Sequence, residues 1–459
     1  MSETYVLPRP TQSRVTAVFA AVKTVFAGRN NSAAALQSLA TKILVLVLNA
    51  ATGIVTARAL NPAGRGTMSA IITWPGFCAL LLTLGLPSSL TFNLRRHPER
   101  TPEIVGAASL LTLLVGVVTG LLGFVLVPLW LTEYSAADIA HAQWMLLASP
   151  LPTMLLFGRA VLEAKGNFFA SNLSLWLAPL LTLIWLVVVV ASGHATPLSC
   201  GLAYVLATLP CAILLLAQVY STYRPRLRNL GRSLRHLLHF GLRAWGIDLL
   251  NALAVSEQVL VIHFLSPADM GTYIVAASLA RVLSVFQTSA VPVLFPRIAA
   301  RSVADVTRLT GFTLRITTFC AVIGAVIAGA LGPILMRSFY GARYAEGGVV
   351  VFRLLLAEVV LSGATQVLAQ AHMALERPGT ITAIQALGVG VGLLIMPSMI
   401  REFGGPGAPL ALLISSVIRF SITFVSFPYL LKTAAPRIWP KREDMQLLFA
   451  RLASLTGAA

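Results

Sequence analysis

The chain carries the octapeptide LNPAGRGT at residues 60–67 and repeats it as LSPADMGT at residues 265–272, with five identities. Each copy leaves one long apolar segment and enters another, and Pro87 recurs as Pro292 at the same offset of 205 residues. A second echo relates Leu162–Gly166 to Leu375–Gly379. The sequence therefore predicts a membrane protein built from two repeats of one unit.

The composition places most of the chain in lipid. Apolar residues make up 57% of it and charged residues 11%, with a mean hydropathy of +0.82, whereas soluble domains average about 25% charged residues. A membrane-spanning helix needs about 20 apolar residues. Segments of that kind number twelve: 35–59, 67–92, 104–131, 142–163, 170–192, 198–223, 243–265, 272–296, 309–334, 348–373, 379–400 and 407–431.

The distribution of positive charge tests this topology. The chain has 34 Lys and Arg against 16 Asp and Glu. With a cytoplasmic N-terminus, 23 of the cations fall in inner segments, as the positive-inside rule requires. The outer connections hold only five, Arg58, Arg65, Arg337, Arg343 and Arg401. The remaining six lie inside predicted spans: Lys42, Arg159, Arg281, Arg315, Arg353 and Arg419.

Six helices per half is an even number, so both halves begin on the same side of the membrane. We therefore expect parallel repeats, related by a pseudo-twofold axis along the membrane normal. The predicted organisation is an N-lobe at 35–223, a basic linker at 224–242, a C-lobe at 243–431 and cytoplasmic tails at 1–34 and 432–459. The spacing of Val15, Val18, Val22 and Phe26 is typical of an interfacial helix within the first tail.

Three stretches resemble the polysaccharide flippases of the multidrug, oligosaccharidyl-lipid and polysaccharide exporter superfamily. They are Ala57–Gly66, which is similar to the family's first outer loop, Glu257–Pro296, and the Tyr340–Tyr344 loop. The chain departs from the family pattern at Asn61 and Ser266, where Gly is usual, and at Glu257, where Asp is commoner. The resemblance implies two six-helix lobes that form a V-shaped central cavity and move lipid-linked glycans by alternating access.

The repeated motif has a structural and a functional interpretation. Pro62, Gly66, Pro267 and Gly271 suit a helix start and a close approach of the backbone, so the motif closes the outer ends of paired helices. The functional interpretation is that the two copies form matched outer gates.

Polar residues inside the spans indicate where a cavity lies, because a charge at the bilayer centre costs about 2.5 to 3.5 kcal/mol on insertion scales. Lys42 and Asn49 share one stripe of the first helix, and Asp248 and Asn251 share a face of the seventh. Arg281 lies ten residues beyond Gly271, about 15 Å along an ideal helix. We predict a substrate-binding cavity from these five residues, with Lys42 and Arg281 attracting a diphosphate; structural ion pairs are the alternative.

Further polar residues form a second tier of cavity or packing candidates. Gln258 shares the face of Asp248, whereas Glu257 points to the opposite side of a regular helix. Arg353 and Glu358 are a candidate ion pair within one helix, similar to Arg159 and Glu163. The second tier comprises Glu257, Gln258, Arg353, Glu358, Gln366 and Gln370.

No motif in the sequence indicates catalysis or metal binding. The chain has no Walker A run, and its seven His and four Cys show no metal-ligand spacing. We therefore expect no enzyme activity, no cofactor and no nucleic-acid binding; coupling to a proton or sodium ion stays open. The expected partners are membrane lipids, a polyprenyl-diphosphate-linked glycan, and a polymerase and glycosyltransferases of the same pathway.

Three functional hypotheses follow for a monomer with both termini on the cytoplasmic side of a bacterial inner membrane. The first is a flippase that moves a lipid-linked oligosaccharide from the inner to the outer leaflet. The second is a cation-coupled multidrug antiporter, for which acids such as Asp248 and Glu257 would dominate the lumen. The third is a transport-inactive scaffold for envelope assembly. The cations at Lys42 and Arg281 favour the flippase.

Overall fold

The structure is a computed structural model that describes residues 31–255, 257–299 and 301–439, without the side chains of 31–40, 42, 244, 246–257, 292, 293 and 296. The proposed interfacial helix at Val15–Phe26 and most of both tails lie outside the described residues. Every regular element in the described part is helical. An all-α membrane fold is thereby confirmed.

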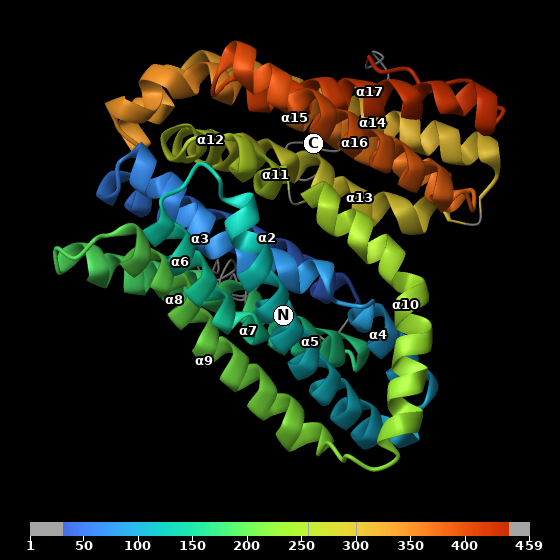
Figure 1. Cartoon of the computed structure of the whole chain (residues 1–459). Coiled ribbons are helices and arrows are strands. Elements are labelled where there is room, and N and C mark those ends of the chain that lie inside the picture. Colours follow the sequence, from blue (N-terminus) through green and yellow to red (C-terminus); the bar gives the residue numbers. More distant parts are fainter. Residues whose placement is uncertain (1–30, 256, 300, 440–459) are drawn as a thin grey trace, which may run out of the picture.

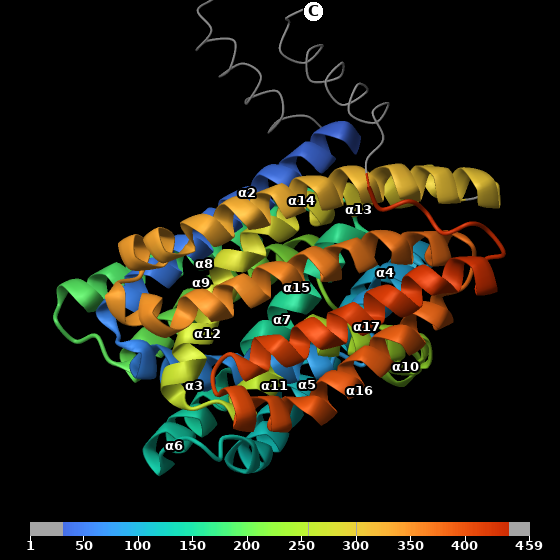
Figure 2. The same ribbon diagram turned by 90° about the horizontal axis from the view of Figure 1, so that it is seen from above.

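Two helical bundles make up the molecule (Figure 1). The N-terminal bundle comprises α2 (Asn31–Ala59), α3 (Pro62–Leu81), α4 (Leu86–Arg96), α5 (Thr101–Trp130), α6 (Ala136–Met145), α7 (Pro150–Ala164), α8 (Phe168–Ala191) and α9 (Pro197–Tyr223). Helices α10 (Leu230–Val255) and α11 (Glu257–Phe264) lead to the C-terminal bundle of α12 (Pro267–Ala280), α13 (Val285–Ile298), α14 (Val303–Phe339), α15 (Ala342–Ala374), α16 (Pro378–Phe403) and α17 (Gly407–Leu430). Figure 2 shows α14, α15 and α17 running side by side.

Nine helices in the described residues are long and apolar enough to cross a membrane, or up to ten if the bent pair α3 and α4 is one span. Nine of the twelve predicted spans coincide with these helices. The other three fall on α2, on the bent pair, and on α10 with α11. Large apolar side chains stay exposed on α5, α8 and α14, as lipid-facing surfaces require. The chain is a multi-pass membrane protein, although the count of twelve is not confirmed.

The repeated motif begins two helices in the same way. Asn61 caps α3 by accepting a hydrogen bond from the Gly64 nitrogen at 2.8 Å, and Ser266 caps α12 by accepting one from the Asp269 nitrogen at 3.3 Å. Proline follows at the first helical position of both helices. Asn and Ser are favourable N-caps, so the two departures from glycine in the motif strengthen these helix starts.

The prediction of one continuous helix at 67–92 is wrong, because α3 and α4 meet at a bend of 44°. Leu84 and Gly85 adopt φ angles of +50° and +66°, and a Cβ atom on Gly85 would overlap the carbonyl oxygen of Gly241 in α10. The Trp245 indole donates a hydrogen bond to the Leu81 carbonyl at 2.7 Å. Helix α10 thus packs against the N-terminal bundle at this bend.

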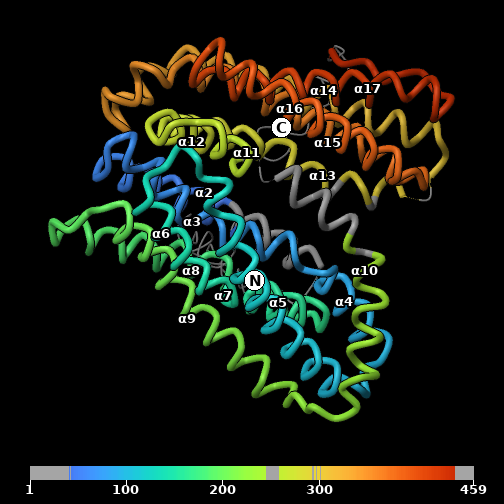
Figure 3. The backbone as a smooth tube through the Cα atoms, viewed as in Figure 1, coloured from blue at the N-terminus to red at the C-terminus, as the bar shows by residue number. Residues whose placement is uncertain are grey.

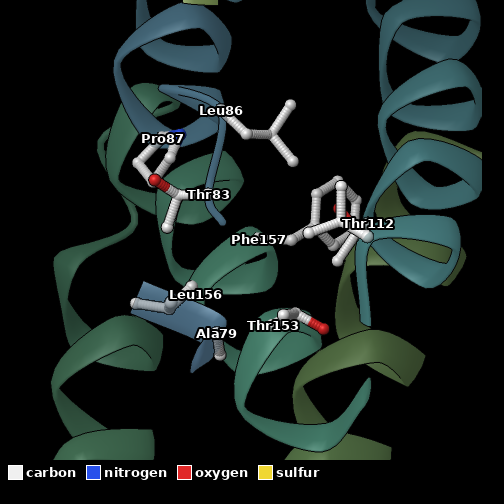
Figure 4. Close-up of a pocket in the computed structure, with 9 residues that line it drawn as sticks. Ala79, Thr83, Leu86, Pro87, Thr112, Thr153, Leu156 and Phe157 are labelled. Carbon is white, nitrogen blue, oxygen red and sulfur yellow. The ribbon is translucent and has the colours of Figure 1, made fainter. Parts of the chain in front are cut away.

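A small cavity of about 20 Å³ lies behind this bend, between α3, α4, α5 and α7 (Figure 4). Thr83, Leu86, Thr112 and Phe157 are among its lining residues. A volume of this size holds about one water molecule. The cavity is therefore far too small for a glycan cargo.

Helix α10 begins at Leu230, inside the segment predicted as a basic linker, and carries the chain from one bundle to the other (Figure 3). We call the end of the molecule that holds Pro62 and Pro267 the motif end, and the end that holds the Arg224–Arg228 connection the linker end. The bundles approach each other at the motif end and diverge toward the linker end (Figure 1).

Candidate functional site

The two copies of the motif pack directly against each other. A Cβ atom on Gly66 would overlap the Pro267 carbonyl oxygen and lie 2.9 Å from the Gly271 nitrogen. A Cβ atom on Gly271 would overlap the Pro62 carbonyl oxygen and lie 3.0 Å from the Gly66 nitrogen. We call this contact of Pro62, Gly66, Pro267 and Gly271 the seam. Its reciprocity is what a twofold relation between the copies produces, and only glycine permits so close an approach.

Hydrogen bonds between the bundles flank the seam. The Tyr344 hydroxyl of α15 donates to the Leu60 carbonyl at 3.1 Å. Arg58, in the last turn of α2, donates from Nε to the Phe339 carbonyl at 2.9 Å and from Nη2 to the Ser338 carbonyl. These two carbonyls end α14, where a cation is favourable because a helix C-terminus carries partial negative charge. The seam therefore has both backbone contact and polar links.

A second set of links joins α11 to the N-terminal bundle. The Trp130 indole donates to the Val259 carbonyl at 2.8 Å, and His263 Nδ1 lies 2.7 Å from the Trp130 carbonyl. A carbonyl only accepts, so the Nδ1 atom of His263 carries the proton. Gln258 Nε2 donates to Thr73 Oγ1 at 3.2 Å. Gln258, a second-tier candidate, thus makes a contact between α11 and α3.

Arg65 lies next to the seam and is almost fully buried, with 7% of its surface exposed. Its Nε has no hydrogen-bond partner among the described residues, and Nη1 reaches only the Met68 sulfur at 3.7 Å. Burial raises the pKa of Tyr340, and the charge of Arg65 acts in the opposite direction. This arginine is a buried charge without a described carboxylate beside it.

Arg281 occupies a break in its helix. Helix α12 ends at Ala280, and a short 3₁₀ turn from Arg281 to Ser284 leads into α13. The predicted span at 272–296 coincides with this apolar segment, but the 3₁₀ turn at Arg281 was not predicted. The Arg281 side chain is exposed and has no hydrogen-bond or ion-pair partner among the described side chains. Such 3₁₀ breaks often mark functional hinges.

Three of the five predicted cavity residues, and Glu257 of the second tier, have no described side chain. Lys42 lies on α2, Asp248 and Asn251 lie on α10, and Glu257 begins α11. Asn49 is described, is exposed, and lines a cavity of about 280 Å³ within the N-terminal bundle, together with Thr182, Tyr204 and Thr208. The structure therefore does not bring Asn49 and Arg281 into one described cavity, and the shared cavity stays a prediction.

The predicted ion pair of Arg353 with Glu358 is wrong. Arg353 Nε donates to the Gly329 carbonyl of α14 at 3.1 Å. Glu358 instead faces α17, where Ser416 donates to it at 2.8 Å and Arg419 lies 3.8 Å away. Residues five apart do not share a helix face. Arg419 is the partner that sequence reasoning missed, although an unassigned arginine inside a span was a signal for one.

The remaining second-tier residues, Gln366 and Gln370, lie on α15. Gln370 Nε2 donates to the Gln366 carbonyl at 3.2 Å, and the Gln366 side chain is exposed. Sequence reasoning also missed Trp130, His263 and Tyr344, because their partners lie more than a hundred residues away.

The linker end carries a basic aromatic cavity of about 780 Å³. Arg95, Arg96, Phe92 and Phe240 are among its lining residues. The rings of Phe92 and Phe240 stack at 4.3 Å between centroids, and the Arg96 guanidinium lies 5.5 Å from the Phe92 ring. Glu163 also lines the cavity, so the wall combines apolar surface with two arginines and one carboxylate.

The fold and its motifs match known proteins. The family model described as "Polysaccharide biosynthesis protein" matches residues 28–301. No curated protein matches the chain. The structure is similar to the lipid II flippase MurJ in an inward closed conformation, with a TM-score of 0.72 and 11% identity over 92% of this chain and 93% of that one.

Multidrug transporters share the fold as well. An inward-facing MATE transporter gives a TM-score of 0.69 at 13% identity, covering 87% of this chain and all of that one. An outward-facing MATE transporter gives 0.59 at 13% identity, with coverage of 88% and 96%. With its family model matched over more than half its length, the chain belongs to the polysaccharide biosynthesis protein family and has the fold of these membrane transporters.

Proposed function

We propose that the protein is a flippase that carries a polyprenyl-diphosphate-linked oligosaccharide from the inner to the outer leaflet by alternating access. The observation that carries the proposal is the seam. Two bundles meet there through facing glycines at one end and diverge toward the other, as a gate requires. Membership of the polysaccharide biosynthesis family and the higher TM-score against an inward-facing transporter than against an outward-facing one support this reading.

The orientation follows from charge. Six arginines from Arg224 to Arg243 lie in the linker segment, which belongs to the inner segments with 23 cations, whereas the outer connections hold five, so the positive-inside rule makes the linker end cytoplasmic. The motif end is then extracytoplasmic, both termini are cytoplasmic, and the membrane is the bacterial inner membrane. The basic aromatic wall at Arg95 and Arg96 faces the leaflet where a lipid diphosphate would enter.

Cargo contact is assigned to Lys42, Asn49, Asp248, Asn251 and Arg281. The exposed guanidinium of Arg281, which has no partner among the described side chains, supports this role, because guanidinium groups bind phosphate oxygens in a bidentate manner. The N-lobe, linker and C-lobe keep the bounds 35–223, 224–242 and 243–431. The protein is a monomer without enzyme activity that receives its cargo from glycosyltransferases and delivers it to a polymerase.

The antiporter alternative has less support from the described residues. Glu358 is the buried carboxylate that the structure describes inside the C-terminal bundle, and Arg419 already neutralises it. A carboxylate held in this way is a poor ion carrier.

Complementation tests the proposal. A strain that lacks its polysaccharide flippase would receive wild type, Lys42→Ala, Arg281→Ala or, as a control, Arg401→Ala, an exposed arginine in the last turn of α16. We expect export by wild type and Arg401→Ala and a loss of at least about tenfold in the other two, as for a lost charge-assisted contact. Unimpaired export by both cavity variants would remove the site assignment, and no export by wild type would contradict the proposed cargo.

A further inference from the structure

A pocket of about 770 Å³ straddles the two bundles beside the seam. The last turn of α2 and the loop after it, Ala57–Pro62, form one wall. The Arg337–Tyr344 connection between α14 and α15 forms the other. A ligand in this pocket would therefore touch both bundles at once.

The pocket is strongly positive. Three of the five cations predicted at this end of the molecule line the pocket: Arg58, Arg337 and Arg343. Among the described residues that line it there is no Asp or Glu. Arg58 donates hydrogen bonds from Nε and Nη2 to carbonyls at the end of α14, and its Nη1 has no hydrogen-bond partner among the described residues. Arg337 and Arg343 have no hydrogen-bond or ion-pair partner within the described part of the chain. Clustered guanidinium groups without carboxylates repel one another, so the pocket favours an anion.

The backbone adds to this polarity. Helix α15 begins beside the pocket with Gly341 at its N-cap, at φ +106°, and no side chain caps it. Its first N–H groups therefore lack the side-chain acceptor that Asn61 provides for α3. A helix N-terminus carries partial positive charge and binds phosphate readily. A Cβ atom on Gly341 would meet nothing within 4 Å, so there is space beside these donors.

A further charge lies close by. Arg65 is buried beside the seam with an unpartnered Nε, and its charge acts on Tyr340, which lines the pocket. Closing the seam thus gathers four arginines from both bundles. An anion between them relieves their repulsion only in the closed arrangement.

We propose that this pocket binds a phosphate group that bridges the bundles and holds the seam closed. Arg58 and Asn61 contact it from the N-terminal bundle, and Arg337, Arg343 and the start of α15 contact it from the C-terminal bundle. Because the group binds one state, it stabilises that state increasingly as its concentration rises above the dissociation constant. Its source is either an anionic phospholipid headgroup or soluble phosphate, and the site is independent of the cargo that the protein moves.

Binding is measured on the full chain in phosphatidylcholine nanodiscs, with radiolabelled inorganic phosphate as the probe. We expect saturable binding that Arg343→Gln weakens by about tenfold or more, as for a lost charge-assisted hydrogen bond. Arg401→Gln, which removes the same charge from an exposed residue outside the pocket, should leave the dissociation constant unchanged. Equal weakening by both variants would show general charge attraction and overturn the proposal.

Closure is measured by the distance between spin labels at Ala63→Cys and Ala268→Cys, which are exposed first-turn positions of α3 and α12, with the native cysteines replaced. Added phosphate should narrow the distance distribution toward the closed value. If 20% phosphatidylglycerol does the same and displaces the phosphate, the headgroup is the source; if only phosphate acts, the source is soluble. No effect of either on binding or distance would overturn the proposal, whatever the export result.

Discussion

Two buried arginines, one in each bundle, have similar exposed fractions of 7% and 5% but opposite surroundings. Arg419, inside the C-terminal bundle, lies 3.8 Å from Glu358 and donates to Ser416 at 2.7 Å and to Gln385 at 3.1 Å. Arg65, beside the seam, contacts the Met68 sulfur and has no carboxylate beside it among the described residues.

Arg419 is buried in the interior of a folded bundle, whereas Arg65 is buried only while the two bundles are closed against each other. A buried charge is costly without an opposite charge beside it, and the C-terminal bundle supplies one to Arg419 in the carboxylate of Glu358. At the seam the cost is incurred only while the bundles are closed. Arg65 therefore destabilises the closed state relative to the open one, and the facing glycines, the flanking hydrogen bonds and the proposed phosphate oppose it.

The largest expected effect comes from forcing the seam apart. Gly66→Ala places a methyl group where the Pro267 carbonyl oxygen lies, and backbone on both sides cannot yield as a side chain would. We expect the closed state to be lost and export to fall by more than about tenfold, since overpacking costs about 1 to 3 kcal/mol. The readouts are glycan export and the distance between labels on Ala63 and Ala268.

Gly390→Ala is the matched control, because it is also a glycine inside a helix, α16, and a methyl group there meets no atom within 4 Å. Normal export by both variants would show that the seam does not need to close.

Removing Arg419 from its ion pair should lower the stability of the fold and leave closure of the seam unchanged. Arg419→Leu leaves the Glu358 carboxylate buried without its cation, which costs about 3 to 5 kcal/mol. We expect a clearly lower thermal unfolding midpoint in detergent, and the double variant with Glu358→Leu should recover most of it. If the single variant unfolds like wild type, the pair is not the structural element described above.

Removing Arg65, the buried arginine beside the seam, should stabilise the closed state. Arg65→Met replaces a buried charge with a long, unbranched apolar side chain, so the closed state gains about 1 to 3 kcal/mol. The label distance across the seam should shift toward the closed value, and export should slow because opening becomes harder. A shift toward the open value would mean that Arg65 stabilises closure, and the contrast with Arg419 would fail.

The smallest expected effect concerns one hydrogen bond. Tyr344→Phe removes the donor to the Leu60 carbonyl and should weaken closure by about 1 kcal/mol, or roughly fivefold in the closed-to-open ratio. The same labels measure it, and thermal stability should change little. A loss of folding instead would place Tyr344 in the bundle core and not at the gate.

Much of the fold follows from the sequence because every span that crosses lipid needs about 20 apolar residues in a helix. The predicted ranges 198–223 and 379–400 match Pro197–Tyr223 and Pro378–Phe403, since a proline starts each helix. The breaks at Gly85 and Arg281 were missed because the apolar pattern continues through them. The first depends on Gly241, more than 150 residues away, which no local pattern reveals.

The candidate site was less predictable. The repeat indicates that Gly66 and Gly271 occupy similar environments, but not that each is the other's neighbour, which depends on how the bundles are oriented. Glu358 was assigned to Arg353 by proximity in sequence, whereas its partner lies on another helix. Pairing between helices depends on rotation about each axis, and periodicity leaves that rotation open.

Helix α10 has a consequence for how the chain can be divided. Its contacts through Gly241 and Trp245 bind it to the bend of α3 and α4, and Ser89 donates to the Leu237 carbonyl at 2.7 Å. A cut at the exposed residues after Tyr223 would thus give two fragments, and the second would carry a helix that docks on the first. We therefore expect the protein to assemble without the peptide bond there, so that two separately synthesised halves would associate through this helix.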